Sequence, residues 1–451
     1  MNATYNRFKS WLGAPIDGQV IGLFRLLFGL FMAYYALYYY RIGLIPEGLQ
    51  KSKILFKYEF FEWVPLLPGP LMYFILFLMG AAALLIAAGV FFRWACWLFS
   101  LCLAFFLFQE KSYYNNHIYL FILLPLLLSA TDADRYLSLS RKPRPASVQR
   151  WQQFILAAQV MMVYFYAGIV KFKADWLLRK EPMSTMIRDF PDAHWMASLI
   201  KHDVNINLFT YGGFLLDILA PFLLFYKPVR NWAWIPFALF HLTNSQVFND
   251  IGIFPFVMLG AMILFFDTNE IPVLHALSPA AAGQGKGKKR QASVPEAPPA
   301  PSALTRNLLL GYFAFQILFP LRGLLLPNPL DYTTIGNRFA WRVKADTRNQ
   351  QEVNFTLVDP ASGEARKVDV ATFLNPMQRK AVATDPRCTV AFARLLRDEA
   401  EKMGFPKAQV KASIRYSYNS RPVQYFVDPE TDLAPASVSP FRKVEWLVLP
   451  E

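Results

Sequence analysis

An apolar run that begins at Phe154 ends on a lysine, Lys171. Lysine is costly inside a bilayer, so a lysine at the end of an apolar helix either extends to lipid headgroups or takes part in chemistry. Removal from water favours the neutral amine, which is the form that can act as a general base. The stretch Val163–Trp176 around this lysine is therefore the first candidate for a reaction centre.

Further polar side chains occur at the ends of other apolar segments. Such residues are costly in or beside a membrane span, so they mark candidate sites. If the segments cross a membrane in the order argued below, four helices bring their polar ends to one level of one leaflet. Amides and imidazoles at the level of a base could stabilise developing oxyanions and move protons. Besides Lys171, the residues are Asn115, Asn116, His117, Asp217, His241, Asn244 and Gln246.

Each of these residues also has a purely structural interpretation. A histidine at a helix end can anchor the helix at the interface, and amides can join helices through hydrogen bonds worth ~0.6–2 kcal/mol. Arg25, toward the opposite end of its span, can reach lipid phosphates. Tyr164, Tyr166 and Trp176 suit an interfacial aromatic belt. The coincidence of four helices favours a functional site over these alternatives.

The composition indicates where these helices lie. Hydrophobic residues make up 55% of the 451 residues, more than the roughly 45–50% of soluble proteins, and they form long blocks, so we predict an integral membrane protein. The net charge is +14, but Lys and Arg fall largely in short loops, so the positive-inside rule explains the charge better than nucleic-acid binding does. The three cysteines show neither metal-ligand spacing nor a disulfide framework, so we expect no metal site.

Nine apolar segments are predicted to span the membrane. The N-terminus and the loops after the fourth, sixth and eighth segments are rich in Lys and Arg, which places them in the cytoplasm. The loop after the fifth segment is long and contains tryptophan, so we expect it to be folded. The predicted spans are Gly22–Tyr40, Leu71–Phe92, Ala95–Gln109, Ile118–Ala130, Phe154–Lys171, Gly212–Tyr226, Trp232–Val247, Ile251–Phe266 and Leu304–Leu326.

These segments define the predicted domains. Residues 1–274 form a helical membrane domain with eight spans, and residues 275–303, rich in Ala, Gly, Pro and Lys, form a disordered cytoplasmic linker. The last span covers residues 304–326, and residues 327–451 form an extramembrane β-rich, sandwich-like domain. Its predicted strands are Phe339–Ala345, Val353–Val358, Lys367–Val370, Val410–Tyr418 and Pro422–Val427, and its single predicted helix is Pro386–Met403.

Several stretches occur together, and in this order, in one known family. In the helical part they are Phe24–Gly29 (FRLLFG), Asn115–Leu120 (NNHIYL), Tyr164–Trp176 (YFYAGIVKFKADW), Gly212–Phe225 (GGFLLDILAPFLLF) and Phe240–Phe248 (FHLTNSQVF). In the last third they are Phe373–Pro376 (FLNP), Asp428-Pro429, Ser439–Phe441 (SPF) and Trp446. Nearly end to end, the chain resembles the vitamin K-dependent γ-glutamyl carboxylase family, within the wider group of horizontally transferred transmembrane domain proteins.

The resemblance implies a reaction. A vitamin K hydroquinone of the menaquinol or phylloquinol type is deprotonated by a lysine, which Lys171 matches. After oxygen adds, the strong base that forms removes a γ-proton from a glutamyl side chain, which then attacks CO2. The products are γ-carboxyglutamate and vitamin K epoxide. Asn116 and His117 match the residues that support this chemistry, and the C-terminal domain is expected to hold the Glu-containing peptide.

The other candidate residues take supporting roles in this interpretation. The quinone neighbours are predicted to be Asn115, His241, Asn244, Gln246 and Tyr166, the supporting residues Asp217 and Arg25, and the peptide contacts Phe373 and Asn375. A direct contact with Asp217 would hold Lys171 charged. We therefore expect Asp217 to pair elsewhere, with His241 as a candidate partner, and Lys173 to be solvated.

Two departures from the family pattern leave alternatives open. The lysine doublet of animal members is Val170-Lys171 here, and the tyrosine before Leu-Asn-Pro is Phe373, which lacks a hydroxyl. The alternatives are a quinol epoxidase that does not carboxylate glutamate and a non-enzymatic quinone-binding membrane module. We expect the partners to be the lipid bilayer and a quinone, with no nucleic acid. The expected location is a bacterial inner membrane, with the site and the C-terminal domain toward the periplasm.

Overall fold

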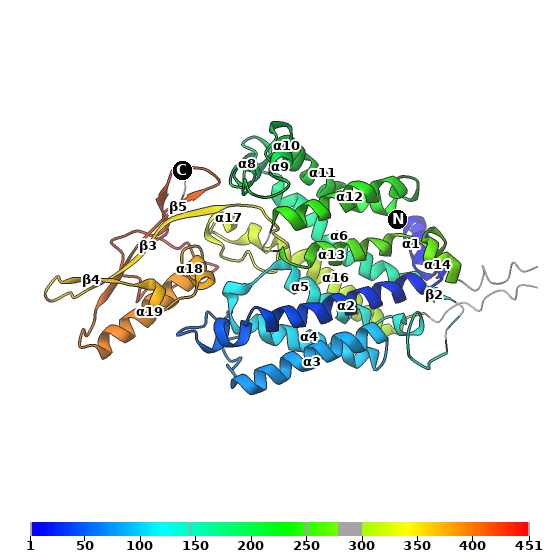
Figure 1. The fold of residues 1–451 in the computed structure, drawn as a ribbon, viewed down its shortest axis with the longest axis horizontal. Helices are drawn as coiled ribbons and strands as arrows, with labels where there is room; N and C mark the ends of the chain where they lie inside the picture. Colours follow the sequence, from blue (N-terminus) through cyan, green and yellow to red (C-terminus); the bar gives the residue numbers. More distant parts are fainter. Residues whose placement is uncertain (1, 144, 146, 249–250, 278–299, 450–451) are drawn as a thin grey trace, which may run out of the picture.

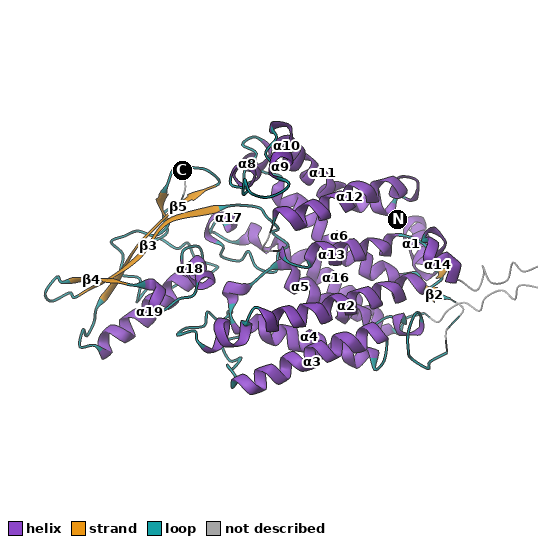
Figure 2. Cartoon of the chain, viewed as in Figure 1, coloured by secondary structure: helices purple, strands orange, loops and turns teal. Residues whose placement is uncertain are grey.

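The structure is a computed structural model that describes residues 2–143, 145, 147–248, 251–277 and 300–449. It consists of a bundle of long helices and a smaller C-terminal domain at one end of that bundle (Figure 1). Most strands lie in the C-terminal domain, whereas β1 (Pro15–Ile16) and β2 (Val148–Gln149) form a short pairing beside the bundle (Figure 2). The predicted fold class, a polytopic helical domain followed by a domain with β-structure, is confirmed.

The predicted spans are largely helical, and six helical segments in the described residues are long and apolar enough to cross a membrane. Two further apolar helices, α5 (Asn116–Leu128) and α13 with its continuation (Phe254–Phe265), are shorter. Helix α12 (Lys227–Val247) is long but mixes polar with apolar residues. The six are α2 (Gln19–Arg41), α3 (Gly69–Ala88), α4 (Phe92–Gln109), α6 (Trp151–Lys171), Val204–Phe225, which includes α11 (Gly213–Phe225), and Ala303–Leu325, which begins with α16 (Ala303–Leu318).

Small residues allow two helix pairs to approach closely, as is common in membrane bundles. A Cβ added at Gly29 of α2 would lie 2.4 Å from the backbone nitrogen of Ala87 in α3. A Cβ added at Gly168 of α6 would lie 2.8 Å from the backbone nitrogen of Ile218 in α11. Gly168 is one turn before Lys171, so the glycine that brings α6 against α11 also brings Lys171 level with α11.

The segment between α6 and α11 is folded, as predicted. It contains the short helices α7 (Ala174–Leu177), α8 (Met183–Arg188), α9 (Ala197–Ile200) and α10 (Asp203–Asn207). Trp176 of α7 is buried, and its indole Nε1–H donates to the backbone oxygen of Thr210, 2.8 Å away. Other short helical turns cover Leu44–Gln50, Lys111–Tyr113, Ala133–Arg135, Leu208–Gly212, Thr268–Glu270, Phe319–Leu325 and Val370–Thr372, and the remaining helices of the helical part are α1 (Asn2–Gly13) and α14 (Pro272–Leu277).

The C-terminal domain contains an antiparallel sheet with the strand order β4-β3-β5-β6. The strands are β3 (Arg348–Val358), β4 (Ala365–Val368), β5 (Gln409–Tyr418) and β6 (Gln424–Tyr425), and the helices are α17 (Leu330–Thr333), α18 (Pro376–Val382) and α19 (Pro386–Lys402). Helix α19 packs on the sheet, where Phe392 meets Phe355 with ring centroids 4.9 Å apart. In the described part of this domain, a helix thus covers the sheet where a sandwich would place a second sheet.

Two local predictions for residues 275–345 differ from the structure. Phe339–Ala345 is not a strand, because Phe339, Trp341 and Lys344 have positive φ angles, and the buried Trp341 ring stacks on Tyr119 of the bundle at 4.9 Å. The alternating apolar residues of this stretch therefore pack against helices. The predicted disordered linker falls mainly on residues 278–299, which lie outside the described residues, and α14 extends to Leu277, past the predicted start of the linker.

Candidate active site between the helical and C-terminal domains

Lys171 and Asp217 form a buried pair. The Lys171 Nζ contacts Asp217 Oδ2 directly, and each residue exposes 5% or less of its surface. The pair corrects the expectation that Asp217 lies away from the lysine. The physical reason is the close approach of α6 and α11 at Gly168, which places the two side chains at one level. Burial without a partner would be costly for either charge, so the pair compensates both.

His241 does not pair with Asp217 but with Tyr164. The Tyr164 hydroxyl lies 2.5 Å from His241 Nε2, and both side chains are buried. The charge of Asp217 acts on Tyr164, so the two pairs are neighbours. The other ring nitrogen of His241, Nδ1, is buried with no hydrogen-bond partner among the described residues. A buried polar atom without a partner is costly, so this nitrogen is available to form a hydrogen bond with a group that enters the cavity.

These side chains line a small cavity of about 70 Å³. Its walls come from α6, α11, α12 and α13, and from residues 343–344 of the C-terminal domain. The indole of Trp176 also lines it, with its ring centroid 4.9 Å from Lys171 Nζ. The structure thus brings together the polar ends of three predicted spans. The predicted residues that line this cavity are Lys171, Asp217, His241 and Asn244.

The fourth polar helix end lies next to this cavity. Asn115, Asn116 and His117 line a polar chamber of about 400 Å³, and Asn115 and His117 also line a larger chamber of about 990 Å³. Asn116 is held in place because it accepts a hydrogen bond from Tyr114 and donates one, 2.9 Å long, to the backbone oxygen of Arg342. Asn116 therefore joins α5 to the C-terminal domain.

The two chambers are lined by more cations than carboxylates. The lining carboxylates are Asp346 and Asp385. Asp331 and Glu59 do not line the chambers, but they form ion pairs with the lining residues Arg342 and Lys111 and are counted here as well. Cations remain in excess, which favours an anionic occupant. The lining cations are Lys111, Arg338, Arg342, Lys344, Arg348 and Lys380.

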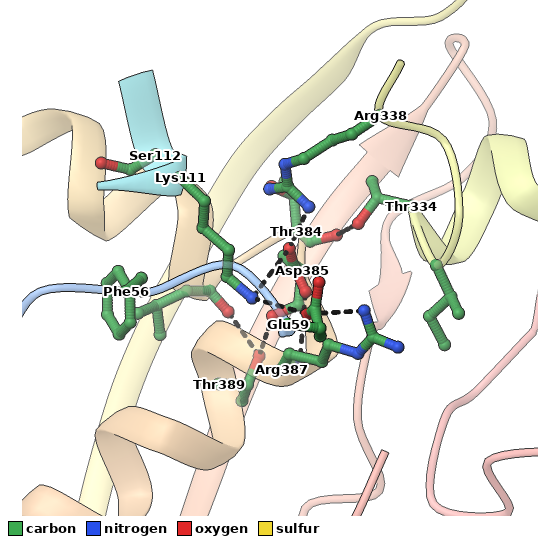
Figure 3. A network of polar contacts seen from close by, with 12 residues as sticks. Phe56, Glu59, Lys111, Ser112, Thr334, Arg338, Thr384, Asp385, Arg387 and Thr389 are labelled. Carbon is green, nitrogen blue, oxygen red and sulfur yellow. Dashed lines mark hydrogen bonds and ion pairs between the residues drawn. The ribbon is translucent and has the colours of Figure 1, made fainter. Parts of the chain in front are cut away.

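Lys111, Arg338 and Asp385 line the larger chamber and belong to one ion-pair network, which Figure 3 shows. Asp385, at the start of α19, pairs with Arg338 at 2.8 Å and with Lys111 at 3.7 Å, and Lys111 also reaches Glu59 at 3.4 Å. Burial alone would raise the pKa of the Asp385 carboxyl, but the charges of Lys111 and Arg338 hold it well below its usual range. This network joins the segments that precede α3 and α5 to the C-terminal domain.

A second set of ion pairs fixes the segment that follows Lys171. Lys173, expected to be solvated, pairs with Asp331 of the C-terminal domain at 3.2 Å. Asp175 receives two hydrogen bonds from the Arg421 guanidinium, at 2.7 and 2.8 Å. Although burial would raise the pKa of Asp175, hydrogen bonds from Arg421 and Asn419 hold it below its usual range. The end of α6 is therefore held against the C-terminal domain.

Five predicted site residues lie outside the cavity and the chambers. Arg25 lies elsewhere in the bundle, where its guanidinium donates to backbone oxygens that include those of Ile86, Ala133 and Leu137. Tyr166 donates to the backbone oxygen of Ile317 at 2.5 Å and so holds α16. The others are Gln246, which donates to Ser245, Phe373, which packs on Phe392, and Asn375, which caps α18 and donates to Tyr113.

Some lining residues gave no signal in the sequence. Tyr164 suits an aromatic belt by its sequence position, but it is buried beside His241. Phe254 lines the cavity and carries no polar group. Arg348 and Lys380 lie on a strand and a helix of the C-terminal domain that no local pattern places beside His117. The only available signal was the excess of basic residues between positions 338 and 348.

The fold is an apolar helical bundle closed at one end by a second domain, with a buried lysine–carboxylate pair, and it defines a membrane protein with an enclosed polar site. Residues 14–269 match the HTTM domain family, and residues 301–451 match the family described as vitamin K-dependent gamma-carboxylase, lumenal domain. The chain therefore belongs to the vitamin K-dependent gamma-carboxylase family and is a gamma-carboxylase-like membrane protein. No solved structure matches the chain in the comparison with known folds.

Proposed function

We propose that this protein is an enzyme that couples oxygenation of a reduced vitamin K-type hydroquinone to carboxylation of glutamyl side chains with CO2. The observation that carries the proposal is the burial of Lys171 and Asp217 in a cavity that borders a cationic chamber under the C-terminal domain. The family match supports the same assignment.

The residues fit a hydroquinone. The larger chamber is lined by aromatic side chains of α2 and α13, among them Tyr35, Tyr38 and Phe256, which suit an isoprenoid quinone that arrives from the bilayer. The unpartnered Nδ1 of His241 and the amide of Asn244 offer hydrogen bonds to a quinol oxygen. When bound, the hydroquinone would react with oxygen and so supply the strong base that the carboxylation of glutamate requires.

Lys171 acts in this proposal as the base that takes a proton from a quinol hydroxyl. Its pair with Asp217 has no net charge, and transfer of the lysine proton to Asp217 leaves a neutral amine and a neutral carboxylic acid. In the resting pair the carboxylate favours the protonated lysine, and this transfer releases the amine that acts as the base. Asp217 therefore sets the charge of Lys171, while the apolar walls of the cavity keep water from the reacting groups.

The cationic chambers support a glutamyl substrate. An acidic peptide between the C-terminal domain and the bundle would meet Arg348 and Lys380, which line both chambers together with His117. His117 is then the polar group of α5 that faces the peptide, with Phe254 between it and the Lys171 cavity. The predicted peptide contacts Phe373 and Asn375 would act through the packing of α18 rather than by direct contact.

The charged loops support an orientation. The N-terminus and the basic loops would lie in the cytoplasm, and the C-terminal domain and the site on the opposite face, which is the periplasmic face of a bacterial inner membrane. The lipid bilayer, a quinone and a Glu-containing peptide are the proposed partners.

The test is a coupled assay on the purified full chain in detergent. Reduced menaquinone-4, oxygen, [14C]bicarbonate and a glutamate-rich peptide are supplied, and epoxide and fixed label are measured together. The proposal predicts both products, in similar amounts and both dependent on the quinol. Epoxide that forms at the same rate with or without peptide, with no fixed label, would instead identify an uncoupled quinol epoxidase.

A further inference from the structure

Phe254, the first residue of α13, lies between the two candidate histidines. Its ring stacks on His117, with centroids 5.8 Å apart and planes 28° from parallel, and meets the ring of His241 edge-on at 6.5 Å. The two histidines belong to different spaces, because His117 lines the outer chambers and His241 lines the Lys171 cavity. Phe254 lines both the 400 Å³ chamber and the Lys171 cavity. Its ring is therefore part of the wall that separates them.

The Lys171 cavity is too small to hold a hydroquinone ring while this wall is in place. An apolar cavity of about 150 Å³ is one that holds a benzene molecule, whereas the cavity beside Lys171 has about 70 Å³. A two-ring hydroquinone does not fit there with Phe254 in place. Most of the other walls are packed helices, and residues 343–344 of the C-terminal domain complete them. Lys171 is held by Asp217, and His241 is held by Tyr164. Of the groups that border both spaces, the Phe254 ring is the large apolar side chain that can leave without breaking a polar contact.

We propose that Phe254 is a movable partition, displaced when the hydroquinone ring binds beside Lys171 and returned to shield that cavity from the cationic chamber when it is empty. This inference rests on the proposed function. In this inference, the position of the Phe254 ring decides when the Lys171 cavity is open to the cationic chamber. A permanent opening would let water collect beside Lys171 while the cavity is empty, and water that stays there when the hydroquinone reacts would quench the strong base before it met the substrate.

The first test measures binding without catalysis. Menadione, a two-ring quinone without a side chain, is the probe, and its Kd is measured by equilibrium dialysis against the full chain in detergent. Phe254→Ala removes the ring that must be displaced, so its Kd is expected to fall at least threefold relative to the unchanged protein. Phe254→Leu, which keeps more bulk and protects against misfolding, is expected to lie between the two. An unchanged Kd in both variants would overturn the partition.

The second test measures coupling. In the assay with quinol, bicarbonate and peptide, Phe254→Ala is expected to raise the ratio of epoxide to fixed CO2 at least threefold. The matched control is Phe99→Leu, a buried phenyl group of α4 outside the cavity linings, which should leave the ratio unchanged. An unchanged ratio in Phe254→Ala, with both products formed, would overturn the partition.

The two tests separate this inference from the proposed function. Tighter menadione binding by Phe254→Ala, in a protein that forms no epoxide, would support the partition and overturn the proposed function. Normal carboxylation by a Phe254→Ala protein with unchanged menadione affinity would support the function and overturn the partition.

Discussion

The amine of Lys171 contacts the carboxylate of Asp217, and the two side chains are buried together at the end of the bundle that meets the C-terminal domain. Neither residue could hold a charge there alone without a large cost. The pair explains how a lysine can be stored in an apolar site, and it makes the charge of the lysine depend on its neighbour.

Asp217→Asn is expected to change the pH dependence more than the maximal rate. The carboxylate favours the protonated lysine, so its removal favours the neutral amine. The acidic limb of the epoxidation pH profile should therefore move to lower pH, with the rate at neutral pH kept within about tenfold because the base itself remains. Epoxide formation measured from pH 5 to 9 checks this. A loss as large as that from removal of Lys171, at every pH, would mean that Asp217 is itself the base.

Tyr164→Phe is expected to weaken quinol use. The change removes the hydrogen bond to His241 Nε2, which leaves the imidazole free to turn away from the cavity. A hydrogen bond of this kind contributes about 1 kcal/mol, so the KM for quinol should rise roughly fivefold. Tyr166→Phe is the matched control, because the Tyr166 hydroxyl donates to the backbone oxygen of Ile317 in α16 and Tyr166 does not line the cavity. Equal effects of the two variants on the KM would contradict the assignment of Tyr164.

Lys380→Met is expected to weaken peptide binding through charge. Lys380 lines both chambers from an exposed position on α18. Exposed charge pairs contribute ~0.2–1 kcal/mol, so the KM for a glutamate-rich peptide should rise roughly threefold. Added salt screens such charges, so the KM should also become less sensitive to salt than in the unchanged protein. Lys402→Met, on the exposed end of α19, is the control. No difference between the two variants would argue against an acidic occupant of the chambers.

Asp385→Asn is expected to destabilise the contact between the domains. The change leaves Lys111 and Arg338 without their shared carboxylate, and breaking a buried pair costs about 3–5 kcal/mol. Because the folded-state pKa of Asp385 is below its unfolded value of about 3.9, its contribution is complete above that pH and is lost only as the pH falls further. Urea unfolding at pH 7 and at pH 5 should therefore show the same difference between variant and unchanged protein. A difference that vanishes by pH 5 would contradict the assignment.

Periodic features of the chain could be predicted well from the sequence. Apolar runs gave the helices because a bilayer demands long apolar segments, and the polar helix ends at Lys171, Asp217 and His241 meet as predicted. Alternation of apolar residues was a poorer guide, since Phe339–Ala345 packs on the bundle and forms no strand. Alternation of apolar residues indicates which side chains are buried, but it does not indicate which element they pack against.

Pairing between residues could not be predicted. The demands of a base predict that Asp217 lies away from Lys171, but the approach of α6 to α11 at Gly168 places the two side chains together. Phe254 has no polar group to attract attention, and its position between His117 and His241 depends on how α5, α12 and α13 pack. Contacts of this kind are set by tertiary packing, which local patterns do not contain.

The central claim is that Lys171 is the base for quinol oxidation, and the most direct measurement is epoxide formation by variants of that residue. Lys171→Ala leaves Asp217 unpaired, so the double variant Lys171→Ala/Asp217→Asn is measured beside it, with Lys173→Ala as the matched control. The account predicts that both variants lacking Lys171 lose epoxide formation and CO2 fixation together, by roughly 10²–10⁴-fold, whereas Lys173→Ala and Asp217→Asn stay within about tenfold of the unchanged protein. Epoxide formation by the folded double variant at a rate within about tenfold of the unchanged protein would contradict the account.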